Sequence, residues 1–352
     1  MDATPLIGVL MYMVGGALGA SFYLPFKKVK NWAWESYWLI YCLAALIVVP
    51  WVLALIFSPN VISVLRGTTS DTLLRAYLFG AMWGVGGLTW GLGIRYLGLG
   101  LGLAIACGSC AAFGTLVPPI FDGKFGELLT TASGKATLAG VVISLIGIIV
   151  TGGAGMSKER ELSEEQKRAT VAEFNFRKGI LVALFSGVMS AGMEFGLRAG
   201  DPIKALTKTT EPATPAFWQG LPVLVVILLG GFTINFLWCL YLNAKNRTGD
   251  DYTNSGTPLV ANYVFSALAG LIWYSQMLFY TIGDTDIGKY KFSGWSLIMS
   301  SQIIFSSLWG IAFLEWKGSS SRTRKLLAAG LAILVISLVV IGYGTSLKPP
   351  ES

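Results

Sequence analysis

Long apolar segments separated by short polar connections run along the whole chain. A transmembrane helix needs about 20 predominantly apolar residues to cross about 30 Å of hydrocarbon. Windows of that kind predict ten membrane-spanning helices, at residues 4–26, 33–57, 73–97, 99–121, 134–153, 178–199, 215–242, 257–283, 291–314 and 324–346. No stretch long enough for a soluble domain remains, so the pattern predicts an all-α polytopic membrane protein.

The composition agrees with this pattern. Hydrophobic residues make up 54% of the 352 residues and charged residues 13%, with a mean hydropathy of +0.64. Soluble globular chains carry about 25% charged residues. We expect the first segment to stay in place as a helix, because the leading MDATP is acidic and the apolar run is too long for a signal peptide.

The basic residues indicate how the chain is oriented in the membrane. The net charge is +7, but lysines and arginines are spread over the connections between helices and form no single basic face. This distribution argues against a nucleic-acid partner. With the amino terminus outside, 16 of the 26 basic residues fall in the inside connections, at 27–30, 95, 155–178, 245–247 and 317–325. The positive-inside rule therefore favours both termini outside.

Two segments of the chain repeat at one constant offset of 190 residues. Tryptophan and lysine matches, Trp83 with Trp273 and Lys135 with Lys325, are the most specific. Glycine and aliphatic matches keep the same register, among them Gly80 with Gly270, Gly93 with Gly283, Gly140 with Gly330, and Ile143 with Ile333. The first and sixth helices show a fainter match at an offset of 171, where Gly16, Ala20 and Lys27 meet Gly187, Ala191 and Arg198. The sequence therefore predicts a duplication.

Each copy of the duplication holds five predicted helices. An odd number makes the second copy enter the bilayer from the opposite side, so the repeats are inverted. We predict a first repeat at 1–154, a cytoplasmic connecting loop at 155–177 and a second repeat at 178–352. Inverted repeats suit a central site that opens alternately to either side, and this favours a secondary transporter.

Several stretches of the chain resemble one family of transporters. These are SFYLPFKKVKNWAWE at 21–35, FGAMWGVGGLTWGLGIRYLGLGLG at 79–102, WYSQMLFY at 273–280 and LEW at 314–316. They are similar, in matching order, to the L-rhamnose-proton symporter family of the drug/metabolite transporter superfamily. The resemblance implies ten helices in a five-plus-five inverted repeat, located in the bacterial inner membrane. It also implies uptake of L-rhamnose or a close 6-deoxy sugar with protons, without a cofactor, and leaves the oligomeric state open.

A neutral sugar requires aromatic faces for its C–H surfaces and amides or hydroxyls for its OH groups. Trp273, Gln276 and Tyr280 are spaced i, i+3 and i+7 and share one helical face. Trp83 and Trp90 form a similar stripe on the equivalent helix of the first repeat. The other substrate-binding candidates are Tyr274, Asn235 and Gln302. The alternative is that these aromatics face lipid or fill packing gaps, which is less favoured for Gln276 because an amide in hydrocarbon demands partners.

Proton coupling requires a group that gains and loses a proton during the transport cycle. The chain has no histidine, so a buried carboxylate is the expected carrier. Glu35 begins the second helix, and Glu194 lies on the sixth helix with Arg198 at i+4. These three residues are the coupling candidates. The alternatives are a solvated interfacial carboxylate for Glu35 and a structural ion pair for Glu194.

Other classes of function fit the chain less well. A membrane-embedded enzyme would require a nucleophile, a metal set or paired acids beside a cleft, and we expect none. Cys107 and Cys110 form a C-x-x-C without a second pair or a histidine, so we expect packing residues and no metal site. The alternative kept open is a carrier of another monosaccharide or a metabolite exporter of the same superfamily. A charged substrate would require a fixed countercharge. Arg198 supplies this charge only if it does not form an ion pair with Glu194.

Overall fold

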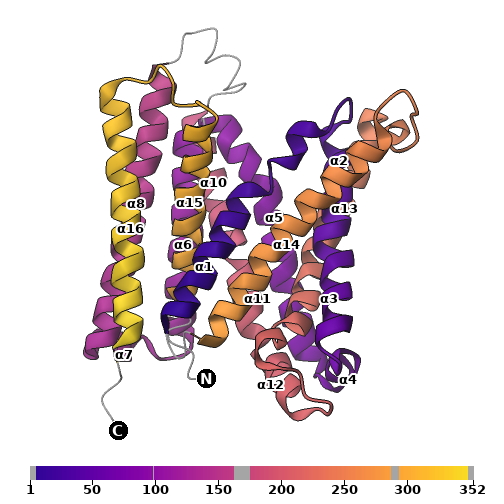
Figure 1. Ribbon diagram of the computed structural model, residues 1–352, viewed down its shortest axis with the longest axis vertical. Coiled ribbons are helices and arrows are strands. Elements are labelled where there is room, and N and C mark those ends of the chain that lie inside the picture. The colour runs from indigo at the N-terminus through magenta and orange to yellow at the C-terminus, as the bar shows by residue number, and fades with distance from the viewer. Residues whose placement is uncertain (1–4, 98, 162–174, 287–292, 348–352) are drawn as a thin grey trace. The chain divides into compact units, whose positions relative to one another are not determined.

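The computed structural model describes residues 5–97, 99–161, 175–286 and 293–347, and these residues form helices joined by short connections (Figure 1). No strand occurs among them. The helices are α1 (Pro5–Ser21), α2 (Trp34–Leu43), α3 (Val49–Phe57), α4 (Val61–Gly67), α5 (Ser70–Leu97), α6 (Leu99–Phe121), α7 (Phe125–Thr130), α8 (Ala132–Arg160), α10 (Phe176–Ser190), α11 (Gly192–Ala199), α12 (Asp201–Thr209), α13 (Leu221–Asn246), α14 (Leu259–Asp286), α15 (Gly294–Ala312) and α16 (Ser321–Ser346).

Nine helical segments in the described ranges are long and apolar enough to cross a membrane. They are Ile7–Lys28, Trp34–Phe57, Ala104–Phe121, Ala132–Arg160, Phe176–Thr209, Ala216–Asn246, Leu259–Thr285, Gly294–Ala312 and Ser321–Ser346. Each corresponds to one predicted span, so the chain is a multi-pass all-α membrane protein. The predicted span at 73–97 is also helical, within the 28 residues of α5, but its glycines and terminal charges keep it outside this set.

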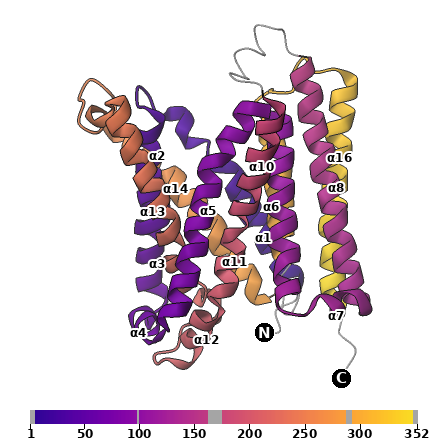
Figure 2. The same cartoon turned by 180° about the vertical axis from the view of Figure 1, so that it is seen from behind.

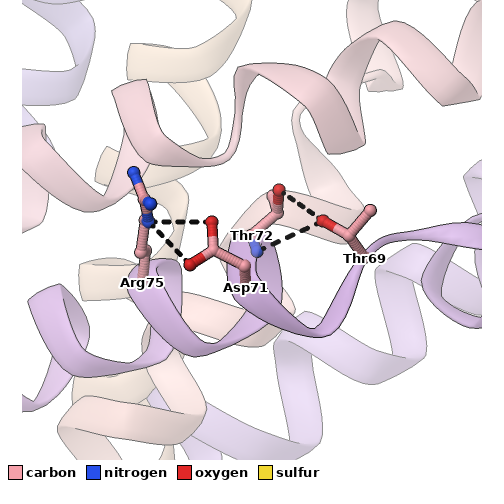
Figure 3. Close-up of polar contacts among 4 residues, drawn as sticks. All are labelled: Thr69, Asp71, Thr72 and Arg75. Carbon is pink, nitrogen blue, oxygen red and sulfur yellow. Dashed lines mark hydrogen bonds and ion pairs between the residues drawn. The ribbon is translucent and has the colours of Figure 1, made fainter.

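The amino-terminal end of α5 shows why a helix starts there. The Thr69 hydroxyl accepts a hydrogen bond from the Thr72 amide at 3.4 Å, which satisfies one of the free N–H groups of the first turn (Figure 3). Asp71 lies in that turn, where a negative charge is favoured by the helix dipole. Arg75 pairs with Asp71 at 2.9 Å, but both side chains are two-thirds exposed, so this ion pair contributes little.

The second predicted span contains a local irregularity. A π-helical turn at Ala44–Val48 joins α2 to α3, and Pro50 follows in the first turn of α3. Proline removes a backbone donor and its ring crowds the preceding turn, so the wider turn relieves the conflict without ending the helix. Gly270 of α14 packs against this turn, where an added Cβ would lie 2.9 Å from the Ala45 amide nitrogen.

Several helix ends differ from the predicted ones by a few residues, and two differences concern the predicted connecting loop and the predicted helix at 178–199. α8 continues to Arg160, into the predicted connecting loop at 155–177, because the residues after Gly155 favour a helix and its last turn carries two basic residues. The predicted helix at 178–199 is divided into α10 and α11 at Ala191. Gly192 follows the break and packs so closely on α5 that an added Cβ would lie 2.6 Å from the Phe79 carbonyl oxygen.

The chain forms two compact units. The first unit comprises Met1–Ala17, Gly86–Ala191 and Gly283–Ser352, and the second comprises Leu18–Val85 and Gly192–Ile282. The boundaries fall inside α1, α5 and α14 and between α10 and α11. Each unit therefore takes segments from both predicted repeats.

Helix pairing differs between the units and is extensive in each. In the first unit, α8 and α16 run alongside each other, and α6 packs against α8, α10 and α15 (Figures 1 and 2). In the second unit, α13 packs against α2 and α3 and also contacts α11 and α12 (Figure 1). α4 contacts α12 at one end of the second unit.

Glycine contacts recur at the offsets found in the sequence. Where α8 crosses α16, an added Cβ at Gly140 would lie 2.9 Å from the Ile341 amide nitrogen, and one at Gly330 would lie 2.8 Å from that of Thr151. The offset of 190 maps the first contact onto the second. In the first unit, Gly93 packs against Ala183, and Gly283 packs against Tyr12. The offset of 190 maps Gly93 onto Gly283, and the offset of 171 maps Tyr12 onto Ala183, so the two contacts are equivalent. Close contacts therefore recur at the offsets that define the predicted repeat.

These crossings predict a stability effect. Gly330→Ala forces a methyl group against the Thr151 backbone, and overpacking of this kind costs about 1 to 3 kcal/mol. We expect a lower melting temperature for the purified protein in detergent, measured by loss of the monodisperse size-exclusion peak after heating. Gly87→Ala is the matched control, since an added Cβ there meets nothing within 4 Å. Equal melting temperatures for the two variants would contradict the close α8 to α16 crossing.

Candidate functional site

A buried carboxylate lies at the centre of the candidate site in the second unit. Glu194 on α11 is fully buried, with 0% of its surface exposed. Its Oε1 atom accepts a hydrogen bond from the Nε atom of Arg198 at 2.7 Å, and the Nη2 atom of Arg198 lies 2.7 Å from the same oxygen as an ion-pair contact. Its Oε2 atom accepts a hydrogen bond from the Tyr280 hydroxyl at 2.5 Å. We call Glu194, Arg198 and Tyr280 the acid cluster.

The local sequence explains how this acid is placed. Glu194 and Arg198 are one helical turn apart and therefore share a face of α11. Two glycines let that helix approach its neighbours: Gly192 packs on the backbone of α5 at Phe79 and Trp83, and Gly196 packs on Ile227 of α13. The predicted ion pair is present, and the structure adds Tyr280 from α14 to it.

Two tryptophans predicted to be equivalent lie against each other in the same unit. The rings of Trp83 on α5 and Trp273 on α14 stack with centroids 5.2 Å apart and planes inclined by 29°. Gly231 of α13 lies beneath the Trp83 ring, where an added Cβ would be 2.5 Å from Cζ3. Tyr41 meets Trp273 edge to face at 6.4 Å. Trp83 thus contacts Trp273, the residue that the offset of 190 predicts to be its counterpart.

Gln276 presents a buried acceptor one turn further along α14. Its side chain is 3% exposed, and no described residue donates a hydrogen bond to its Oε1 atom. The amide lies against Gly19 of α1, where an added Cβ would be 2.5 Å from the amide carbon. Trp273, Gln276 and Tyr280 share one face of α14, so the amide lies between the tryptophan stack and the acid cluster along the helix.

The adjacent candidate, Tyr274, is not on that face. Its side chain is fully buried, and its hydroxyl has no hydrogen-bond partner among the described residues. One residue along a helix turns the side chain by about 100°, so Tyr274 is separated from the stripe formed by Trp273, Gln276 and Tyr280.

Three other predicted binding residues lie elsewhere or are engaged in packing. Trp90 belongs to the first unit and packs against a core of Leu97, Ala106 and Ala183. Gln302 is also part of the first unit, on α15. Asn235 is in the second unit, where its amide donates to the Gly231 carbonyl at 2.9 Å and accepts from the Trp38 indole at 3.0 Å. Asn235 therefore joins α13 to α2.

Glu35 has a well-defined structural environment. It is 5% exposed, so the alternative of a solvated interfacial carboxylate is wrong. Its Oε1 atom accepts hydrogen bonds from the Asn246 amide and the Thr248 hydroxyl, both at 2.9 Å. Next to it, the Ser36 hydroxyl donates to Asp251 at 2.7 Å. Glu35 therefore ties the start of α2 to the end of α13.

The stretch of lysines and tryptophans before α2 is hydrogen-bonded and packed by residues that the sequence analysis did not predict. Asn262 accepts a hydrogen bond from the Lys30 amide at 3.0 Å and donates one to the Lys30 carbonyl at 2.9 Å. Trp32 is 8% exposed and packs edge to face on Tyr252 and Tyr263. The only available signal was the presence of asparagines and aromatics beside the predicted helix ends.

The arrangement in the second unit suits a neutral polar ligand and a proton. The tryptophan stack offers an apolar aromatic surface, and Gln276 offers an unused acceptor for a hydroxyl group. The acid cluster offers a carboxylate that is fully removed from solvent. Intramembrane ionisable groups of this kind are costly and mark ion or substrate pathways. Groups of three or more potential metal ligands are not found in the described ranges.

Comparisons with known proteins agree on one family. The family model described as L-rhamnose-proton symport protein (RhaT) matches residues 1–347. A protein of Cronobacter sakazakii named L-rhamnose-proton symporter is 36% identical over 344 residues, covering 96% of this chain and 97% of the relative. A protein of Yersinia pestis with the same name is 35% identical over 348 residues, covering 98% of this chain and 99% of the relative.

The acid cluster predicts a large stability effect. Arg198→Met leaves the fully buried Glu194 carboxylate without its cation, and breaking one side of a buried ion pair costs about 3 to 5 kcal/mol. We expect a clear drop in the melting temperature of the detergent-purified protein. Adding Glu194→Gln to Arg198→Met removes the unpaired charge and should restore most of the loss. A double variant no more stable than Arg198→Met would contradict the pairing.

Proposed function

The chain belongs to the L-rhamnose-proton symporter family, and on that premise we propose that it carries L-rhamnose into the cell together with protons by alternating access. It is a transporter and not an enzyme. The observation that carries the mechanism is the buried acid cluster beside an unpartnered amide and an aromatic stack, all within the second unit.

We propose that the protein spans the membrane ten times, as two inverted repeats of five helices at 1–154 and 178–352. α5 supplies the tenth span, since its 28 residues extend about 42 Å and exceed the hydrocarbon thickness. The recurrence of glycine contacts at the sequence offsets supports the duplication. The stacking of Trp83 on Trp273 also supports it, because equivalent residues meet each other only near the axis that relates two repeats.

The sugar site in this proposal is formed by Trp83, Trp273 and Gln276. L-Rhamnose has a methyl group and several C–H bonds that pack well on an indole ring, and hydroxyls that donate to an amide oxygen. The two rings are only 5.2 Å apart, so the sugar does not fit between them. It packs against the edge of the stack and donates a hydroxyl hydrogen bond to the Gln276 Oε1 atom.

Glu194 carries the coupled proton in this proposal. Protonation removes its charge and weakens the hydrogen bonds that it accepts from Arg198 and from Tyr280, so proton binding changes how α11 is held against α14. Gln276 and Tyr280 share a face of α14, which links the acid cluster to the sugar-binding amide. A proton moving inward down a 100 mV potential supplies about 2.3 kcal/mol for accumulating a neutral sugar. Glu35 keeps a structural role at the joint of α2 and α13.

We place the protein in the bacterial inner membrane with both termini outside. The excess of basic residues in the connections assigned to the inside supports this orientation. An anionic metabolite is disfavoured as substrate, because Arg198 is already paired with Glu194. A carrier of another neutral monosaccharide is the alternative that the same site accommodates.

The proposal predicts a sugar-dependent proton movement. Deenergised cells that express the protein, in a weakly buffered and sodium-free suspension, should make the medium more alkaline when L-rhamnose is added. L-Fucose, L-lyxose and D-glucose serve as comparison sugars under the same conditions. The measurement is the external pH. A silent pH trace with L-rhamnose, despite confirmed expression, would refute proton symport of this sugar.

The carboxylate that carries the proton is tested in the same assay. Glu194→Gln should abolish the alkalinisation, since the neutral amide binds no proton, while exchange of labelled L-rhamnose across the membrane continues. Glu35→Gln is the matched buried control, and it should keep the alkalinisation because an amide oxygen still accepts from Asn246 and Thr248. The reverse pattern would assign coupling to Glu35.

A further inference from the structure

The Gln276 amide is held in an unusual way for a buried polar side chain. Its side chain is 3% exposed and its Oε1 atom has no donor in the described part of the chain. A buried acceptor without a partner costs free energy, typically about 1 to 3 kcal/mol. Such a cost is expected where a ligand supplies the missing donor, so the orientation of this amide matters for binding.

Gly19 on α1 determines where that amide lies. The three atoms nearest to an added Cβ at Gly19 are Oε1, Cδ and Nε2 of Gln276, with the last two at 2.5 and 3.2 Å. The whole amide therefore occupies the space that a side chain at residue 19 would fill. Gly16, one turn earlier, differs, because an added Cβ there would meet the Ser301 and Gln302 backbone of α15 as in ordinary close helix packing.

We propose that Gly19 is a positioning residue of the sugar site: the missing side chain at this residue forms a seat that orients the Gln276 amide so that Oε1 accepts a hydroxyl of the sugar. The inference rests on the proposed function, since it presumes that Gln276 binds the transported sugar. Gly19 does not touch the sugar and acts only through Gln276.

The equivalent crossing in the first unit contains a related seat. The offset of 171 maps Gly19 onto Ser190, and the offset of 190 maps Gln276 back onto Gly86. An added Cβ at Gly86 would lie 2.5 Å from the Ser190 amide nitrogen and hydroxyl oxygen. In the first unit the glycine lies on α5 and the polar residue, Ser190, on α10, whereas in the second unit the glycine lies on α1 and the polar residue, Gln276, on α14. A glycine thus allows close approach at both crossings, but at Gly86 two of the three nearest atoms belong to the backbone, and the space at Gly19 alone of the two is filled by a polar side chain.

The test is a double-mutant cycle on L-rhamnose transport by the full-length protein in cells, with initial rates measured over a range of sugar concentrations. Gly19→Ala displaces the amide and should raise KM about tenfold while changing the maximal rate less than twofold. Gln276→Ala should raise KM by at least as much. Adding Gly19→Ala to Gln276→Ala should then have no further effect, because the atoms it would displace are already gone.

A rescue separates positioning from a general packing defect. Asparagine at residue 276 is one methylene shorter and withdraws the amide from residue 19. Gly19→Ala/Gln276→Asn should therefore have a lower KM than Gly19→Ala alone. Gly87→Ala on α5, where an added Cβ meets nothing within 4 Å, is the matched control and should leave KM unchanged.

The outcomes distinguish this inference from the proposed function. KM effects of Gly19→Ala and Gln276→Ala that multiply in the double variant, or an unchanged KM in Gly19→Ala, would overturn the inference while the symporter assignment stands. If Gly19→Ala does not fold, the Gly19→Ala/Gln276→Ala variant should fold, and its failure to do so would also overturn the inference. A wild-type protein that does not transport L-rhamnose would overturn the proposed function and the inference together.

Discussion

A fully buried carboxylate is the constraint on which the second unit depends. Removing an ionised group from water costs several kcal/mol even after relaxation, and the cost is recovered only with a close cation and well-placed hydrogen bonds. Glu194 obtains both, from Arg198 on its own helix and from Tyr280 on α14. The hydrogen bond to Tyr280 fixes α11 against the face of α14 that also carries Gln276 and Trp273. The position of the candidate sugar site thus follows from the requirement to neutralise one charge.

Glycine makes these contacts possible. Association of helices in lipid relies on close packing, since lipid tails are as apolar as the side chains they replace. Gly192 and Gly196 bring α11 against α5 and α13, Gly231 accommodates the Trp83 ring, and Gly19 accommodates the Gln276 amide. Each glycine admits a different partner, namely a backbone, an aliphatic side chain, an indole ring or an amide. The same residue type therefore lies both between closely packed helices and beside the candidate site residues.

The sequence predicted the helices well because hydropathy and length are local properties. It also predicted the Glu194 and Arg198 pair, which depends only on the spacing within one helix. It could not predict that Tyr280 completes the pair or that Trp83 stacks on Trp273, since these contacts join residues more than 80 positions apart. The break at Ala191 was missed, and the contact next to it, between Gly192 and α5, joins residues far apart in the sequence. The burial of Glu35 was missed because its partners, Asn246 at the end of α13 and Thr248 just after it, are also distant in the sequence.

In the proposed duplication, equivalent helix crossings are kept but their chemistry is not. The offset of 171 maps Glu194 onto Tyr23 and Arg198 onto Lys27. Tyr23 belongs instead to an aromatic group in the second unit, where it stacks on Trp38 with ring centroids 6.5 Å apart. A carboxylate is thus present at only one of two equivalent positions. In the proposed cycle, the same group must then accept the proton when the site is open to one side and release it when the site is open to the other. Coupling requires such sharing, because a proton that moved independently of the conformational change would drive no sugar uptake.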